Sequence, residues 1–119
     1  SGPFDLLMIP GGPGVKALRA DGRAADVAKL FALENKPVAA ICAAPGVLFD
    51  AGLLKGRLYT SHHSTHAELT HALAEQRVVQ DSGIITSRGA GTALDFGFAL
   101  VALLFGKEKS DEIAKHIMA

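Results

Sequence analysis

The stretch VAAICAAPGV, residues 38–47, decides how this 119-residue chain folds, and it contains the only cysteine. Its first residues are apolar, as in a strand buried on both faces, and Pro45 suits the first turn of a short helix that ends near Gly52. A second apolar run, FDLLMI at residues 4–9, stops at the turn sequence PGGPG, and residues 24–33 have helical spacing. Strand, helix and strand in this order predict two parallel strands and an α/β fold.

The rest of the chain continues in the same way. The patterns predict a weak strand at 57–61, a polar amphipathic helix at 66–75, strands at 77–81 and 83–87, and a long apolar helix at 91–105. Ser110 is expected to cap a last helix, with Ile113, Ile117 and Met118 on one side. Because no internal repeat or linker interrupts the pattern, we expect one domain over residues 1–119.

Composition excludes several classes of function. The 12 Lys and Arg residues balance the 12 Asp and Glu residues, and the basic residues are scattered, which disfavours a nucleic-acid or anionic-membrane partner. The longest apolar run, residues 96–105, is too short to cross a bilayer and contains Gly97. A lone cysteine and the lack of an opening signal peptide favour a reducing compartment. We therefore expect a cytoplasmic protein with a neutral or small ligand.

Cys42 lies between the end of a predicted strand and the start of a predicted helix. Ligands of open parallel sheets bind at the carboxyl ends of the strands, where a helix N-terminus also stabilises a thiolate. Ala43 and Ala44 permit the sharp turn of a nucleophile elbow, and the backbone N–H groups of PGGPG and Ala43 could converge on one oxyanion. The alternative interpretations are a small buried cysteine and an ordinary glycine turn.

Four blocks of the sequence resemble the ThiJ/PfpI superfamily, in the branch of the parkinsonism-associated deglycase and the bacterial ThiJ-like proteins. The blocks, in order, are DLLMIPGGPG, AAICAAPGVL, TSRGAGTALDFG and LLFGKEKSDEIA. The resemblance extends from Phe4 to Ala119. It implies a flavodoxin-like three-layer α/β sandwich with a mostly parallel sheet, usually assembled as a homodimer, and no cofactor.

The resemblance also implies roles for individual residues. Cys42 corresponds to the reactive cysteine of the family, and His62 would lie near the thiol as a proton carrier. The backbone N–H groups of Gly12 and Ala43 would form the oxyanion site, with Gly11 in the same turn. The block SRGAGT, residues 87–92, would line the same pocket.

Arg88, in this block, is the candidate for holding an anionic group of the substrate through its bidentate fork, although a structural salt bridge fits it equally well.

The function implied by the resemblance is a cofactor-independent, glyoxalase III-type enzyme. Its substrates would be small dicarbonyls such as methylglyoxal, which it would convert to lactate through the cysteine nucleophile. One alternative is an oxidative-stress sensor or redox-regulated chaperone that works through oxidation of the same cysteine. Another is a structural fragment whose activity resides elsewhere. Ala43 stands where the peptidases of the superfamily have a histidine after the nucleophile, which disfavours protease activity.

Members of the superfamily begin with a further strand-helix-strand segment. That segment carries the acidic residue that hydrogen-bonds the cysteine, and this sequence contains no counterpart of it. We therefore expect residues 1–119 to form the C-terminal two thirds of a ThiJ/PfpI-like domain. The remaining segment would precede Ser1 or be supplied by a separate chain, because without it strand edges and apolar faces would be exposed.

Three other motifs point to different chemistry but fit it poorly. The cluster HHSTH, with His62, His63 and His66, suggests a metal site, but it contains no carboxylate and a turn does not make the rings converge, so we expect a loop with one pocket-facing histidine and no metal. GAGTAL lacks the third glycine of a dinucleotide fingerprint, and GGPGVKAL lacks the ending of a phosphate-binding loop. We expect no nucleotide.

Overall fold

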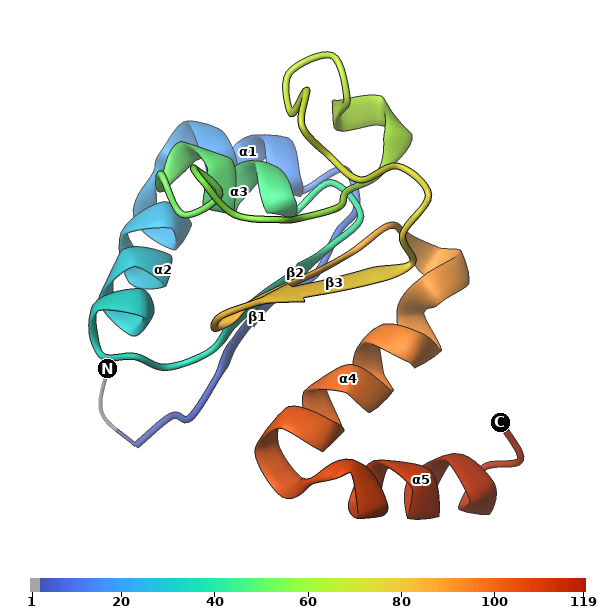
Figure 1. Cartoon of the computed structure of the whole chain (residues 1–119). Coiled ribbons are helices and arrows are strands. Elements are labelled where there is room, and N and C mark those ends of the chain that lie inside the picture. Colours follow the sequence, from blue (N-terminus) through green and yellow to red (C-terminus); the bar gives the residue numbers. More distant parts are fainter. Residues whose placement is uncertain (1–2) are drawn as a thin grey trace.

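A four-stranded sheet forms the centre of the computed structural model, which describes residues 3–119 (Figure 1). The strands lie in the order β1 (Leu7–Ile9), β2 (Val38–Ile41), β4 (Ile84–Ser87) and β3 (Val78–Asp81). The first three are parallel, and β3 runs antiparallel to β4 because a tight turn joins them. The predicted parallel pair and the predicted hairpin are confirmed.

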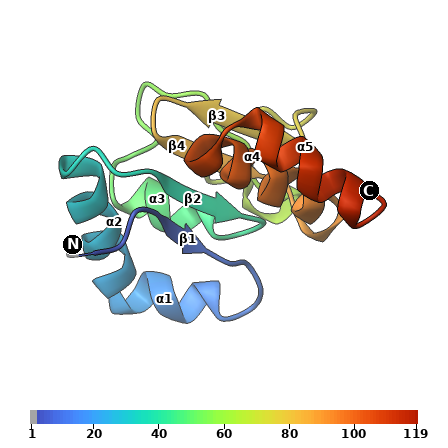
Figure 2. The ribbon, with the colours of Figure 1, turned by 90° about the horizontal axis from the view of Figure 1, so that it is seen from below.

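Helices cover both faces of this sheet (Figure 2). On one face lie α1 (Val15–Asp21), α2 (Arg23–Leu33) and α3 (Pro45–Asp50). On the other lies α4 (Ala93–Phe105), and α5 (Lys107–His116) packs against α4. This is the predicted flavodoxin-like α/β sandwich of three layers. Within residues 3–119, no helix combines the length and the apolar character that crossing a membrane demands.

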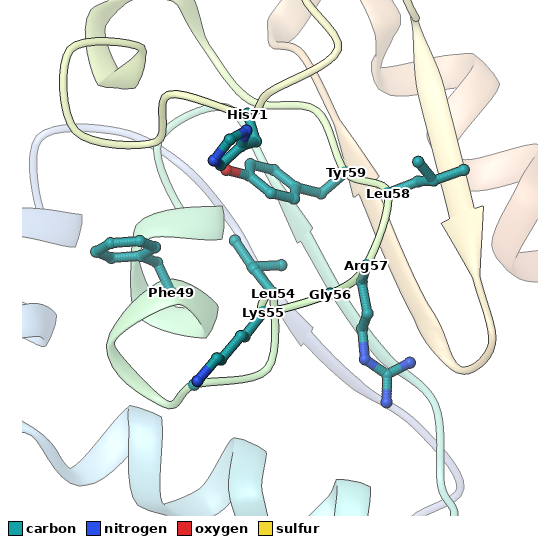
Figure 3. Close-up of a pocket in the computed structure, with 9 residues that line it drawn as sticks. Phe49, Leu54, Lys55, Gly56, Arg57, Leu58, Tyr59 and His71 are labelled. Atoms are coloured by element: carbon teal, nitrogen blue, oxygen red, sulfur yellow. The ribbon is translucent and has the colours of Figure 1, made fainter.

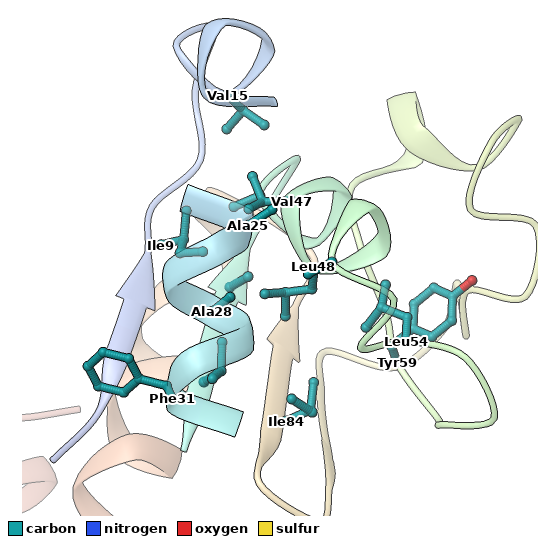
Figure 4. Close-up of a cluster of buried hydrophobic side chains, with 14 of the residues drawn as sticks. Ile9, Val15, Ala25, Ala28, Phe31, Val47, Leu48, Leu54, Tyr59 and Ile84 are labelled. Atoms are coloured by element: carbon teal, nitrogen blue, oxygen red, sulfur yellow. The ribbon is translucent and has the colours of Figure 1, made fainter. Parts of the chain in front are cut away.

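The larger hydrophobic core lies between the sheet and the helices α1 to α3 (Figure 4). Val38 and Ala40 of β2 face this core, and Ala39 between them faces a smaller cluster under α4 that includes Ile85 and Phe96. Such alternation follows from the two-residue repeat of a strand. Because β2 is buried on both faces, it fixes the position of Cys42, the next residue after the strand.

Two predicted elements are wrong, and the hydrogen bonds show why. Residues 57–61 form no strand, because the N–H of Leu58 donates to the carboxylate of Asp81 and the N–H of Thr60 donates to the hydroxyl of Thr86. Residues 66–75 form turns rather than a helix. The N–H of Leu73 donates to the carbonyl of Tyr59, and the Leu73 carbonyl accepts from the Thr60 hydroxyl. Long-range partners thus occupy backbone groups that a helix would use.

Two further differences from expectation concern helices. Helix α1, between the PGGPG turn and residue 24, has no counterpart among the predicted elements, because a single residue of it, Val15, is buried and the hydrophobic pattern is therefore faint. The last helix begins at Lys107 after Gly106, whose positive φ of 94° breaks the chain direction. Ser110 is therefore not a cap; it is buried inside α5 and its hydroxyl donates to the Phe98 carbonyl of α4.

In the described part of the chain, both edge strands of the sheet, β1 and β3, pair with a strand on one side only. Strand β1 pairs only with β2, so its outer edge has no strand beside it within residues 3–119. Met8 in the middle of β1 lies opposite Ala39, on the α4 face, and is 46% exposed. This apolar edge is the feature that the expected strand-helix-strand segment would cover.

Candidate active site

Cys42 follows β2 directly and has a left-handed backbone conformation, with φ of 66°. That region is unfavourable for a residue with a side chain, and it occurs most often where the surrounding structure enforces it. Here the N–H of Cys42 donates to the Ser87 carbonyl at the end of β4 (3.0 Å), and its carbonyl accepts from the N–H of His62 (2.8 Å). The thiol is free and half-buried, at the strand-to-helix turn that the sequence predicted.

The glycine turn after β1 packs directly against this cysteine. A Cβ atom added to Gly11 would stand 2.5 Å from Cβ and 3.3 Å from Sγ of Cys42, and 3.0 Å from the Ile41 carbonyl oxygen. Gly12, the next residue, has φ of 103°, which residues with a side chain rarely adopt. The GG pair is therefore required both by the contact with the cysteine and by the turn itself.

The thiol lies in an open groove of about 610 Å³. Ten residues line it: Gly12, Pro13, Val15, Lys16, Arg19, Cys42, Ala43, His62, Ser64 and Thr65. The structure thus brings together four residues that the sequence singled out, namely Cys42, Gly12, Ala43 and His62. Within residues 3–119, the backbone N–H groups of Gly12 and Ala43 donate to no other group of the chain. Two donors beside a thiol are thus available to an oxygen atom in the groove.

The ring of His62 is oriented by its own loop. The N–H of Ser64 donates to Nδ1 of His62 (3.2 Å), and the Ser64 hydroxyl lies 2.9 Å from the same nitrogen. Because Nδ1 accepts a hydrogen bond from a backbone N–H, the neutral ring carries its proton on Nε2. This assignment leaves Nε2 as the nitrogen that can donate to a group in the groove.

Arg88 lies outside the Cys42 groove. It is exposed and lines a second hollow of about 420 Å³, together with His63, Arg77 and residues 89–92. His62 lines both hollows, and its ring would lie 3.4 Å from a Cβ atom added to Gly89. The SRGAGT block therefore packs beside the groove, and Arg88 faces a neighbouring space that shares one histidine with it.

The other two histidines of HHSTH do not converge with His62 on a common point. His66 uses Nε2 for a hydrogen bond with the Ser61 carbonyl (3.1 Å), and His63 packs its ring against that of His62 with 4.1 Å between centroids. In the part of the chain that the structure describes, no three His, Cys, Asp or Glu side chains come close enough to share a metal ion.

A hollow larger than the Cys42 groove, of about 770 Å³, lies elsewhere (Figure 3). Its walls come from α3 and the segment after it, including Phe49, Leu54, Tyr59 and His71. None of the predicted site residues lines it. The chemistry of the thiol and the unpaired N–H groups, rather than volume, therefore identifies the Cys42 groove as the candidate active site.

Two of the groove residues to which the sequence analysis gave no role, Ser64 and Arg19, make hydrogen bonds that shape the site. Ser64 holds the His62 ring, and the signal for it is local, since a hydroxyl two residues after a histidine can reach Nδ1. Arg19 of α1 binds Asp50 and Glu68, residues distant in sequence, and these hydrogen bonds hold the Arg19 pKa above its ordinary range. Only the fold brings these three charges together.

Comparisons with known proteins agree with this geometry. Residues 1–103 match the DJ-1/PfpI family. The chain is 33% identical to a glutathione-independent glyoxalase of Caenorhabditis elegans over 94% of its length, and 37% identical to the deglycase PfpI of Pyrococcus furiosus over 74%. The solved structure of oxidized Toxoplasma gondii DJ-1 superposes on 98% of the chain with a TM-score of 0.87 and 29% identity.

The chain spans only part of these proteins. It covers 61% of the glyoxalase, 55% of the deglycase and 65% of the Toxoplasma chain. Residues 1–103, which match the family, include the sheet, the cysteine turn and the histidine loop described above. From the matching residues and the shared fold, this chain belongs to the DJ-1/PfpI family.

Proposed function

We propose that Cys42 is the nucleophile of a cofactor-independent enzyme that converts small dicarbonyls, methylglyoxal among them, to hydroxy acids. One observation carries the proposal: a cysteine with a left-handed backbone shares a groove with two unpaired N–H groups and an oriented histidine. The names of the worm glyoxalase and the archaeal deglycase support the same class of reaction.

The chemistry follows from the groups in the groove. The Cys42 thiolate attacks the aldehyde carbon of methylglyoxal, a C–S bond forms, and the carbonyl electron pair moves to oxygen. The N–H groups of Gly12 and Ala43 donate to that oxygen, and His62 provides a proton through Nε2.

A proton then leaves the attacked carbon and another arrives at the neighbouring carbonyl carbon, which gives a lactoyl thioester. Water cleaves the C–S bond and releases lactate, and the thiol is restored with no external oxidant or reductant.

We further infer that the complete site includes more than residues 3–119. A carboxylate that exchanges the substrate proton would come from a segment that pairs with the open edge of β1, within a longer chain or from a separate one. That edge ends beside the PGGPG turn, so a parallel strand added there would bring its carboxyl end close to Cys42. The assembled protein would be a homodimer of a reducing compartment.

The decisive experiment measures lactate formation from methylglyoxal by residues 1–119 assembled with the segment that pairs with β1, and by the same assembly carrying Cys42→Ala. We expect the substitution to abolish turnover, because Cys42 is the only thiol in residues 1–119. A Cys42→Ala protein that forms lactate at the same rate as the parent excludes the proposal. We also expect residues 1–119 alone to be inactive or insoluble, and full activity from this piece would show that the added carboxylate is unnecessary.

A second candidate function is redox sensing through Cys42. The observation that favours it is the half-buried free thiol, together with a structural relative described as oxidized. In this case peroxide would take the thiolate to a sulfenic or sulfinic acid. Mass spectrometry after mild peroxide treatment distinguishes the two: stoichiometric oxidation at Cys42 in a protein that turns over no dicarbonyl favours the sensor.

A further inference from the structure

Arg19 makes an unusual set of ion pairs beside the Cys42 groove. Its Nε and Nη2 atoms donate to the two carboxylate oxygens of Asp50, each at 2.8 Å. Its Nη1 and Nη2 atoms donate to the two oxygens of Glu68, at 2.8 and 2.7 Å. A single guanidinium therefore forms two bidentate pairs, the geometry in which charge-assisted hydrogen bonds are strongest and most directional.

These bonds connect the three segments that form the walls of the groove. Arg19 belongs to α1, which follows the turn with Gly12, and Asp50 ends α3, which follows the cysteine turn. Glu68 comes shortly after the His62 loop, in the segment of turns that has no regular structure of its own. Each of the three segments thus contributes one residue to the ion pairs of the Arg19 guanidinium, and Arg19 itself lines the groove.

The first turn of α3 is shaped to let this side chain pass. A Cβ atom added to Gly46 would stand 3.0 Å from Nη1 and 3.2 Å from both Cδ and Cζ of Arg19. Gly46 is buried in a helix, where glycine is less favourable than alanine. Glycine at position 46 therefore leaves room for the Arg19 side chain, although it does not favour the helix.

Arg19 is poorly suited to bind an anionic substrate. Two carboxylates already surround one guanidinium, and four of its five N–H donors are engaged. Its effect on a reaction at Cys42 must therefore pass through the positions of other groups.

We propose that Arg19 is the positioning residue of this site: it holds the turn with Gly12, the cysteine turn and the His62 loop at fixed mutual distances. The inference about catalysis rests on the proposed function, whereas the inference about groove geometry does not. Without the clamp, the His62 loop is free to move away from the thiol, because Glu68 has no other ion pair among the described residues.

The experiment compares Arg19→Met with Arg23→Met, both in residues 1–119 assembled with the segment that pairs with β1. Arg23 is the matched control, because it begins α2 and pairs with Asp21 (2.7 Å) while its side chain is 87% exposed and away from the groove. With Arg19→Met we expect N-ethylmaleimide to alkylate Cys42 about fivefold faster, as for a loop that opens more often. We also expect a loss in kcat of about tenfold or more with KM within about twofold. Arg23→Met should change neither.

Gly46→Ala keeps both carboxylates and the arginine but displaces the guanidinium. We expect the same two changes to a smaller extent without a loss of thermal stability, since alanine favours the helix. Equal alkylation rates and equal kcat in the parent, Arg19→Met and Gly46→Ala overturn the proposal. If alkylation responds while no variant turns over dicarbonyl, the positioning role stands and the proposed function falls. If the protein turns over dicarbonyl and neither substitution changes kcat, the proposed function stands and the positioning role falls.

Discussion

At the scale of single residues, the contact between Gly11 and Cys42 sets the position of the thiol. We expect Gly11→Ala to destabilise the protein by about 1–3 kcal/mol, because the new methyl group would meet Cβ of Cys42 at 2.5 Å and a backbone carbonyl oxygen at 3.0 Å. Urea denaturation measures the change.

Gly14→Ala is the control for Gly11→Ala, since it lies in the same turn with φ of −65° and with open space around its Cβ position. Similar losses of stability in the two variants would contradict this account.

Whether a residue of the groove could be predicted depends on how far along the chain its contacts lie. Cys42, Gly12 and Ala43 were predictable, because two parallel strands place their carboxyl ends at one edge of the sheet. His62 was expected there only from the resemblance to a family, since no spacing rule brings a loop residue to a thiol 20 positions away. The contact of Arg19 with Glu68 could not be predicted from the sequence, because it depends on where the irregular segment that contains Glu68 packs against α1.

At the scale of elements, the Arg19 clamp makes stability depend on pH. The hydrogen bond from Arg19 lowers the pKa of Glu68 from its ordinary value of 4.5, although the nearby Asp50 opposes this. A lowered pKa in the folded state adds stability above the unfolded pKa, and this stability is lost as the pH falls through the folded value. The clamp should therefore weaken in acid.

We expect Glu68→Gln to cost up to about 1 kcal/mol at neutral pH, a modest value because the side chain is half exposed. The difference from the parent should shrink as the pH falls below 4.5 and through the lowered pKa of Glu68 in the folded state, where Glu68 itself becomes protonated. Urea denaturation of both proteins at neutral and at acidic pH tests this. A difference that stays constant over that range would mean that the charge of Glu68 does not act through Arg19.

The elements themselves were predicted well where burial is periodic and poorly where it is not. Strand β2 and helix α4 have strong hydrophobic patterns, and both occur near the expected residues. Residues 66–75 also have a helical pattern, yet Leu69 is buried in a segment that forms turns. The backbone of Leu73 forms hydrogen bonds with Tyr59 and Thr60. Such long-range partners leave no mark on local spacing, so the prediction failed there.

At the scale of the whole molecule, the open edge of β1 leaves an apolar surface beside α4. Met8 on this surface is 46% exposed, although it lies in the middle of a strand. We expect residues 1–119 to bind anilinonaphthalene sulfonate, and Met8→Lys to weaken dye binding by roughly 1 kcal/mol, about half the value of burying a methionine fully.

Met118→Lys provides the comparison for Met8→Lys, because Met118 is 92% exposed near the C-terminal end and away from the sheet. Fluorescence titration of the three proteins gives the affinities. If the two substitutions reduce dye binding equally, the β1 edge is not the apolar surface in question. A larger effect of Met8→Lys would place that surface where an added strand would dock.

The backbone bonds of Cys42 have a practical consequence. Both of them, to the Ser87 carbonyl and from the His62 N–H, are independent of the sulfur atom, and the chain has no other cysteine. A spin label or fluorophore on this thiol would therefore be attached at one defined position and would leave both backbone hydrogen bonds of Cys42 intact. In a homodimer, two such labels would yield one distance, and that distance would measure how the two grooves are arranged about the symmetry axis.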